Sequence, residues 1–194
     1  MTLKIQKIRT NELGILMLTA FVFATSYAIS EVSATTPNFH GHKWYWEETD
    51  YRYGSFSVAD ITQTQAYGAL DSARSEISSP SDYHADKVTT GNNWITTANW
   101  ADTTKHAQQY PHHDWLNYLD ESDIEFNSNS GHHWSVGTDT TYTNMRAVAN
   151  HEFAHGVDFE HTNTSGTVAY FGYVYSEWTA FNADDDTKMV AIYG

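Results

Sequence analysis

The sequence predicts a single α+β domain, because segments with strand-like patterns alternate with segments of helical periodicity. The chain has 194 residues, of which 40% are hydrophobic and 15% aromatic, which is enough apolar material to bury one core. Residues 58–77 and 144–155 have the spacing of amphipathic helices. Residues 43–54, 124–126 and 134–136 have the composition of strands. A mixture of this kind favours an α+β fold or a three-layer, α/β/α-like arrangement.

Residues 1–34 are predicted to form a signal peptide. Positive residues precede an almost unbroken apolar run, and small residues follow it: Lys4, Lys7 and Arg9, then Leu13 to Ala24, then Ser26, Ala28, Ser33 and Ala34. Cleavage after Ala28 or Ala34 fits this pattern, and the second site is preferred because a polar, extended segment follows it. We expect a mature domain of residues 35–194 that is secreted or held at the cell surface. The alternative, and the only one that involves a membrane, is an uncleaved anchor.

The first strand and the first helix are predicted from periodicity. Residues 43–54 are aromatic and partly alternating, which is typical of a half-buried strand or a hairpin. Apolar residues then recur at helical spacing from Val58 to Ile77, and this spacing predicts an amphipathic helix packed on a sheet. A polar stretch, residues 78–93, interrupts the pattern.

The middle of the chain is less regular. Residues 94–122 have no clean period, so only a short strand at 94–95 and helical turns near 115–119 are predicted. Two further strands, at 124–126 and 134–136, are separated by a turn-prone stretch rich in asparagine, serine and glycine.

Charge and cysteine content exclude several classes of function. Ten lysines and arginines face 24 aspartates and glutamates, so the formal net charge is −14. Because so negative a surface repels phosphates, we expect no nucleic-acid partner. The chain has no cysteine, which excludes disulfides, thiolate zinc sites and cysteine nucleophiles. Any metal must therefore be bound by histidine and carboxylate.

The candidate chemistry lies in residues 144–161. Thr143 or Asn144 can cap the start of a helix there. On that helix His151 and His155 are one turn apart on the same face, so both imidazoles can reach one metal ion, with Glu152 beside them.

A third ligand is needed, since catalytic zinc usually has three protein ligands and one water. Gly156 permits the helix to end after the second histidine, and the chain can then turn back and bring His161 to the metal. A water on zinc has its pKa lowered to about 7. Glu152 is then placed to act as the general base. The pattern predicts a zinc hydrolase with His151, His155 and His161 as ligands.

The sequence resembles a known family at this point. The run from His151 to His161 is similar to the HExxHxxGxxH signature of the metzincin zinc endopeptidases, and in particular to the matrixins. The likeness continues past the motif, because Gly166 and Tyr170 match the segment after the third histidine, and Asp184 to Gly194 resembles the final matrixin helix.

The resemblance implies a metzincin fold and a secreted zinc endopeptidase. The fold would have a twisted, five-stranded, mostly parallel sheet with an antiparallel edge strand, a long active-site helix, and a small C-terminal subdomain that ends in a helix. We place the edge strand near Trp134 to Thr138, where an extended polypeptide substrate would pair with it. The pocket beside zinc would be walled by Val168 to Tyr173.

Three features depart from the family. Asp158 stands where the family has glycine, at a position that needs a positive φ. Ala169 replaces the methionine of the Met-turn, so Val168, Tyr170 or Phe171 must form the floor under the metal. Residues 98–122 are interpreted as an insertion.

Two further interpretations stay open for the metal-ligating residues outside the motif. These residues either form a second metal site or make up a histidine-rich surface: His84 with Asp86, His112 and His113 with Asp114, His132 with His133, and His40 with His42. Asp184 to Asp186 either bind calcium or cap the last helix. The alternative function is a zinc-holding, catalytically weak extracellular binding protein of the same fold, and the presence of Glu152 favours the enzyme.

Overall fold

The computed structural model of the chain describes residues 39–139, 141–162, 166–170 and 180–194. The predicted signal peptide, residues 1–34, lies outside the described residues. No described helix is both long enough and apolar enough to cross a membrane.

A five-stranded sheet forms the base of the domain, with the strand order β2-β1-β3-β5-β4. Its strands are β1 (Glu48–Tyr53), β2 (His84–Lys87), β3 (Asn93–Ala98), β4 (Ala107–His113) and β5 (Leu119–Asn127). Neighbouring strands are parallel except for β4, which pairs antiparallel with β5 at the edge. A separate two-residue ladder joins β6 (Trp134–Ser135) to β7 (Thr143–Asn144). The predicted mostly parallel sheet with an antiparallel edge strand is confirmed.

The position predicted for the edge strand is wrong. The edge strand is β4, Ala107–His113, and Trp134 belongs to the small β6–β7 ladder instead. Residues 98–122 are therefore no mere insertion, because they supply β4 and the beginning of β5. The helical turns predicted near 115–119 are also absent, since this segment is the turn of the β4–β5 hairpin. A half-exposed edge strand such as AQQYPHH buries no face, so it shows no hydrophobic period.

Helix α2 (Gln63–Ile77) begins five residues later than predicted. Thr62 caps it in a capping box with Gln65, and this cap fixes the start of the helix. The predicted apolar face from residue 66 onward is confirmed, with Ala66, Leu70 and Ile77 among its buried residues. The polar stretch after α2 contains the missed strand β2, in which only Ala85 is buried.

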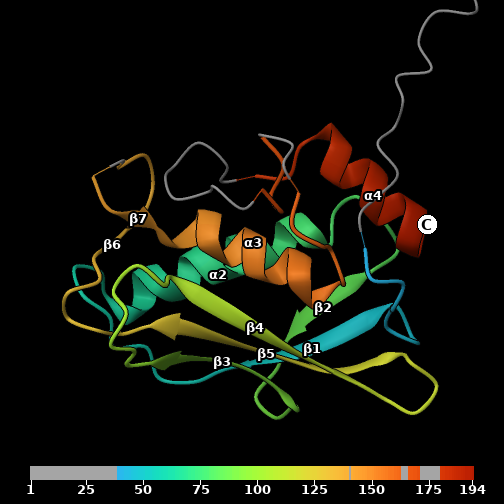
Figure 1. Ribbon diagram of the computed structural model, residues 1–194, viewed down its shortest axis with the longest axis horizontal. Coiled ribbons are helices and arrows are strands. Elements are labelled where there is room, and N and C mark those ends of the chain that lie inside the picture. The colour runs from blue at the N-terminus through green and yellow to red at the C-terminus, as the bar shows by residue number, and fades with distance from the viewer. Residues whose placement is uncertain (1–38, 140, 163–165, 171–179) are drawn as a thin grey trace, which may run out of the picture. The chain divides into compact units, whose positions relative to one another are not determined.

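Helices α2 and α3 (Met145–Gly156) lie next to each other on one face of the sheet (Figure 1). The rings of Tyr51 on β1 and Phe153 on α3 meet edge to face, with their centroids 5.0 Å apart. Near the end of α3, a Cβ atom on Gly156 would lie only 2.8 Å from the Tyr51 hydroxyl and 3.1 Å from the Ser122 hydroxyl. Glycine thus lets the last turn of α3 rest directly on the sheet.

The chain ends in helix α4 (Ala183–Tyr193), as predicted. The Asn182 side chain accepts hydrogen bonds from the backbone amides of Asp184 and Asp185, and the Asp185 carboxylate accepts one from the amide of Asn182. Asp185 therefore takes part in helix capping, and the negative charges of Asp184 and Asp186 in the first turn complement the helix dipole. Calcium binding stays a prediction.

Candidate metal centre

Helix α3 carries the first part of the site. The side chain of Asn144 accepts hydrogen bonds from the backbone amides of Arg146 and Ala147, so the predicted cap is Asn144. The helix continues to Gly156, and this length places His151 and His155 one turn apart on it.

The chain turns back after α3 as the sequence predicts, and the positive φ expected at Asp158 is confirmed. Gly156 is the last helical residue, and the positive φ falls at Asp158, with φ 73°. The amide of Asp158 donates to the carbonyl of His155, and the amide of Phe159 donates to that of Ala154, both at 2.9 Å. These bonds close the helix end and direct the chain back over α3 toward His161.

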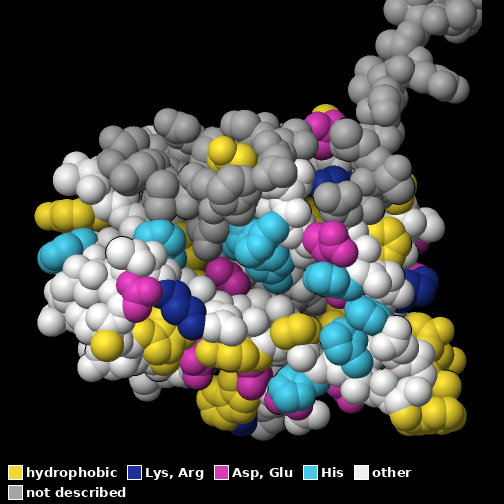
Figure 2. Space-filling model, viewed as in Figure 1, with side chains coloured by type: hydrophobic (Ala, Val, Ile, Leu, Met, Phe, Trp, Pro, Cys, Tyr) yellow, Lys and Arg dark blue, Asp and Glu magenta, His cyan; other side chains and the backbone are white. Residues whose placement is uncertain are grey.

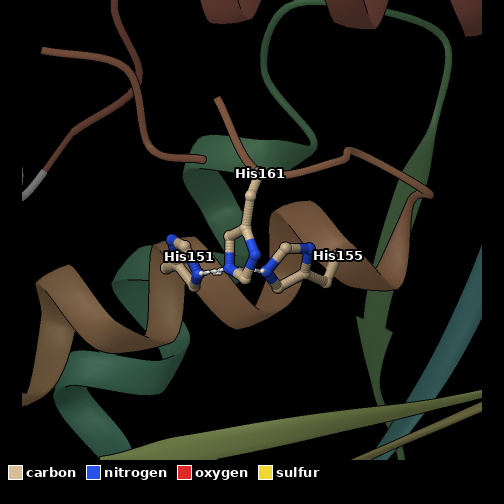
Figure 3. A group of neighbouring side chains, drawn as sticks. All are labelled: His151, His155 and His161. Carbon is tan, nitrogen blue, oxygen red and sulfur yellow. Dashed lines mark hydrogen bonds between the residues drawn. The ribbon is translucent and has the colours of Figure 1, made fainter. Parts of the chain in front are cut away.

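The three predicted histidines meet at one point (Figure 3). The Nε2 atom of His151 lies 3.0 Å from that of His155 and 3.1 Å from that of His161. The remaining distance, between His155 and His161, is 3.0 Å. Two ligands of one tetrahedral zinc with bonds of 2.0–2.1 Å stand about 3.3 Å apart, so the spacing of the three nitrogens fits zinc.

The protonation of two of these rings is fixed by backbone carbonyls. Nδ1 of His151 donates to the carbonyl of Val168, and Nδ1 of His155 donates to that of Phe159, each at 2.7 Å. Because a carbonyl only accepts, the ring proton sits on Nδ1 and each Nε2 presents a lone pair. Two lone pairs 3.0 Å apart share no proton between them, whereas a cation satisfies both.

Burial keeps these imidazoles neutral. It lowers the pKa of His155 to about 4, and it lowers that of His151 well below its ordinary value. A neutral imidazole is the form that binds a metal. Protonation and geometry therefore both fit a histidine metal site.

A family comparison agrees with this geometry. The family model described as Matrixin matches residues 97–194, which is half of the chain. The chain belongs to the matrixin family. Matrixins are zinc metallopeptidases, and the described residues contain the histidine group that such a zinc needs. A comparison with curated proteins finds no match to this chain.

Glu152 follows the first histidine of this matrixin, and its side chain is buried, with 3% exposed. Tyr110 on β4 is close enough to Glu152 for the charge of this glutamate to affect the Tyr110 hydroxyl. Burial and the charges of Glu125 and Glu152 raise the pKa of Tyr110, whose hydroxyl donates to Glu125 at 3.2 Å. Sequence reasoning missed Tyr110 near this site, because β4 itself was not predicted.

The segment beneath the histidines departs from the family but is well packed. Val168 and Ala169 are buried, and the carbonyl of Ala169 accepts from the amide of Thr162 at 3.0 Å. The Asp185 carboxylate of α4 accepts from the amide of Val168 at 3.1 Å, while the carbonyl of Val168 holds His151. That Val168 forms the floor under the metal stays a prediction. Of the predicted pocket wall, residues 171–173 lie outside the described part of the chain.

Of the other sequence-predicted clusters, His40 and His42 have stacked rings with their centroids 6.4 Å apart, while several of the remaining histidines have partners from other segments. His133 Nδ1 lies 2.7 Å from Asp60, and His132 Nδ1 bonds to the carbonyl of Thr103. His84 and Asp86 are exposed on β2. His42 and His113, from two different predicted clusters, meet each other instead.

Proposed function

We propose that this matrixin is a secreted zinc-dependent endopeptidase. In the proposal His151, His155 and His161 hold one zinc ion, and Glu152 is the general base. The observation that carries it is the meeting of three Nε2 atoms within 3.1 Å of one another. In two of the rings Nδ1 donates to a backbone carbonyl, which leaves Nε2 of the neutral ring with a free lone pair. When bound, zinc supplies a Lewis acid that polarises a peptide carbonyl and makes water more acidic.

The protein's own groups perform the remaining steps. Glu152 accepts the proton of the attacking water and then delivers it to the leaving amine. The carbonyls of Val168 and Phe159 keep the rings of His151 and His155 in a fixed orientation throughout.

The substrate is proposed to be an extended polypeptide that pairs with β4. This strand lies at the edge of the sheet and packs against α3, which carries two of the histidines (Figure 1). Within the described residues its outer edge has no strand partner, so its backbone can bind an extended chain. Pro111 has no N–H, and pairing is therefore expected to be confined to Ala107–Tyr110.

The alternative of a zinc-holding protein with weak activity is less favoured. It drew support from Asp158 and Ala169, but Asp158 closes the helix end and Ala169 is buried beneath the site. Neither substitution displaces a histidine from the trio.

The test follows cleavage of an unstructured protein such as casein by the purified, zinc-loaded chain. We expect cleavage that stops with a chelator and returns with zinc. Glu152→Gln should retain zinc and lose at least about a hundredfold in rate. Glu48→Gln, an exposed glutamate on β1, is the matched control and should retain full activity. Zinc-loaded protein without chelator-sensitive cleavage would support the binding-protein alternative, and full activity in Glu152→Gln would exclude this base.

A further inference from the structure

A second group of metal-ligating side chains lies at the end of α3. His42, His113 and Asp158 come from three distant parts of the chain, yet their candidate ligand atoms all lie within 4.8 Å of one another. Among the described residues, only this group and the trio of His151, His155 and His161 bring three such side chains so close. Several groups of histidine side chains lie near one another on the face shown in Figure 2.

Asp158 is the fixed member of this group. Its φ of 73° is a conformation that glycine adopts more easily, and its side chain is buried, with 4% exposed. One carboxylate oxygen accepts from the backbone amide of His42 at 2.7 Å, and the other lies 3.2 Å from Nδ1 of the same residue. An aspartate in place of glycine thus adds a positioned carboxylate to the turn before His161.

The two imidazoles complete the arrangement. The ring centroids of His42 and His113 are 4.2 Å apart, and the ring planes are inclined by 50°. The distance of 3.2 Å between His42 Nδ1 and Asp158 Oδ1 is close to the roughly 3.3 Å between two ligands of a tetrahedral zinc. His113 is exposed at the end of β4, so its ring can adjust to a metal without disturbing the core.

We propose that His42, His113 and Asp158 form a second metal site that binds a divalent transition metal, with zinc as the best match. Two imidazoles and one carboxylate suit zinc, whereas calcium and magnesium prefer oxygen ligands alone. Water completes the coordination. The site is separate from the proposed catalytic centre and does not depend on peptidase activity.

A metal in this site would link three segments of the chain. His42 belongs to the segment before β1, where His40 also pairs with Glu160 at 3.3 Å. His113 is the last residue of β4, and Asp158 lies three residues before His161. A metal here fixes the proposed substrate strand and the turn carrying His161 to one another.

The test is the zinc stoichiometry of the full chain, stripped with a chelator and titrated with zinc alone. We expect two tightly bound ions in the wild type and one in His113→Asn. His161→Asn, which removes an exposed ligand of the catalytic trio, should also bind one ion, and the double variant none. His112→Asn, the exposed neighbour on β4, is the matched control and should bind two.

Asp158→Asn provides a second variant, because asparagine tolerates a positive φ but is a poorer ligand. We expect at least a tenfold weaker second ion. A wild type that binds one ion, with no change in His113→Asn, would overturn the proposal and leave a His42–Asp158 hydrogen bond. Two ions persisting in His113→Asn would also overturn it. Loss of the first ion in His161→Asn is a separate result, so the two sites are judged independently.

Discussion

Single residues fix the end of α3 by close approach and by backbone conformation. Gly156 permits contact with Tyr51 and Ser122, and Asp158 adopts the left-handed conformation that turns the chain. Position 156 has no room for a side chain, whereas the side chain at position 158 is held in place by a hydrogen bond to its carboxylate.

Gly156→Ala should therefore destabilise the domain. The new Cβ would be 2.8 Å from the Tyr51 hydroxyl, within a core that cannot expand freely, so we expect a loss of about 1–3 kcal/mol in the free energy of unfolding. Urea denaturation measures it. Gly68→Ala is the matched control on α2, where nothing lies within 4 Å, and it should be neutral or slightly stabilising. Equal effects of the two changes would contradict this packing argument.

The conformational cost at Asp158 can be measured separately from its contacts. Asp158→Gly and Asp158→Ala both remove the carboxylate, but only glycine accepts a φ of 73° without strain. We expect the glycine variant to be more stable than the alanine variant by about 1 kcal/mol in metal-free protein. Identical unfolding midpoints would show that the turn is not strained.

At the scale of elements, α4 contacts the segment that positions His151. Asp185 at its start holds the amide of Val168, and the carbonyl of Val168 holds the ring of His151. The C-terminal helix is therefore connected to a proposed zinc ligand through one intervening residue. Second-sphere contacts of this kind commonly change metal affinity by ten- to a hundredfold.

The pKa of Asp185 predicts that the stability of the domain depends on pH. Burial raises the pKa of Asp185 to about 6, so the folded state holds its proton more tightly than the unfolded state, whose value is 3.8. The contribution of Asp185 to stability is present below pH 3.8 and is lost as the pH rises through about 6. Asp185→Asn keeps an acceptor oxygen and cannot ionise. Relative to wild type, its free energy of unfolding should rise between pH 4 and 7, and a constant difference across that range would contradict the assignment.

Elements differ in how far local sequence predicts them. The sequence alone predicts helix α3 from its local pattern. It also predicts the meeting of His151, His155 and His161, because these three residues lie within eleven positions of one another. Strand β4 is polar and largely exposed, so its sequence shows no apolar periodicity that would predict a strand. The group of His42, His113 and Asp158 depends on three distant segments, and no local spacing encodes it. Only the positive φ at Asp158 could be anticipated.

At the scale of the whole molecule, the compact unit spans Pro37–Gly194. The signal peptide, residues 1–34, and its cleavage after Ala34 rather than Ala28 stay predictions. Expression in a secreting bacterial host, followed by intact mass measurement of the exported protein, should give a chain that begins at Thr35. A mature chain beginning at Ile29, or an uncut chain in the membrane fraction, would contradict the preferred site.

The open side of β4 also bears on how copies of this chain behave at high concentration. An exposed strand edge invites another molecule to add its own strand, and repeated addition leads to fibres. Here the proline at position 111 interrupts the row of donors after four residues, and two exposed histidines follow it. Among the described residues the free edge is therefore short, so a second copy could add only a few residues of strand before the proline, and growth into fibres is disfavoured.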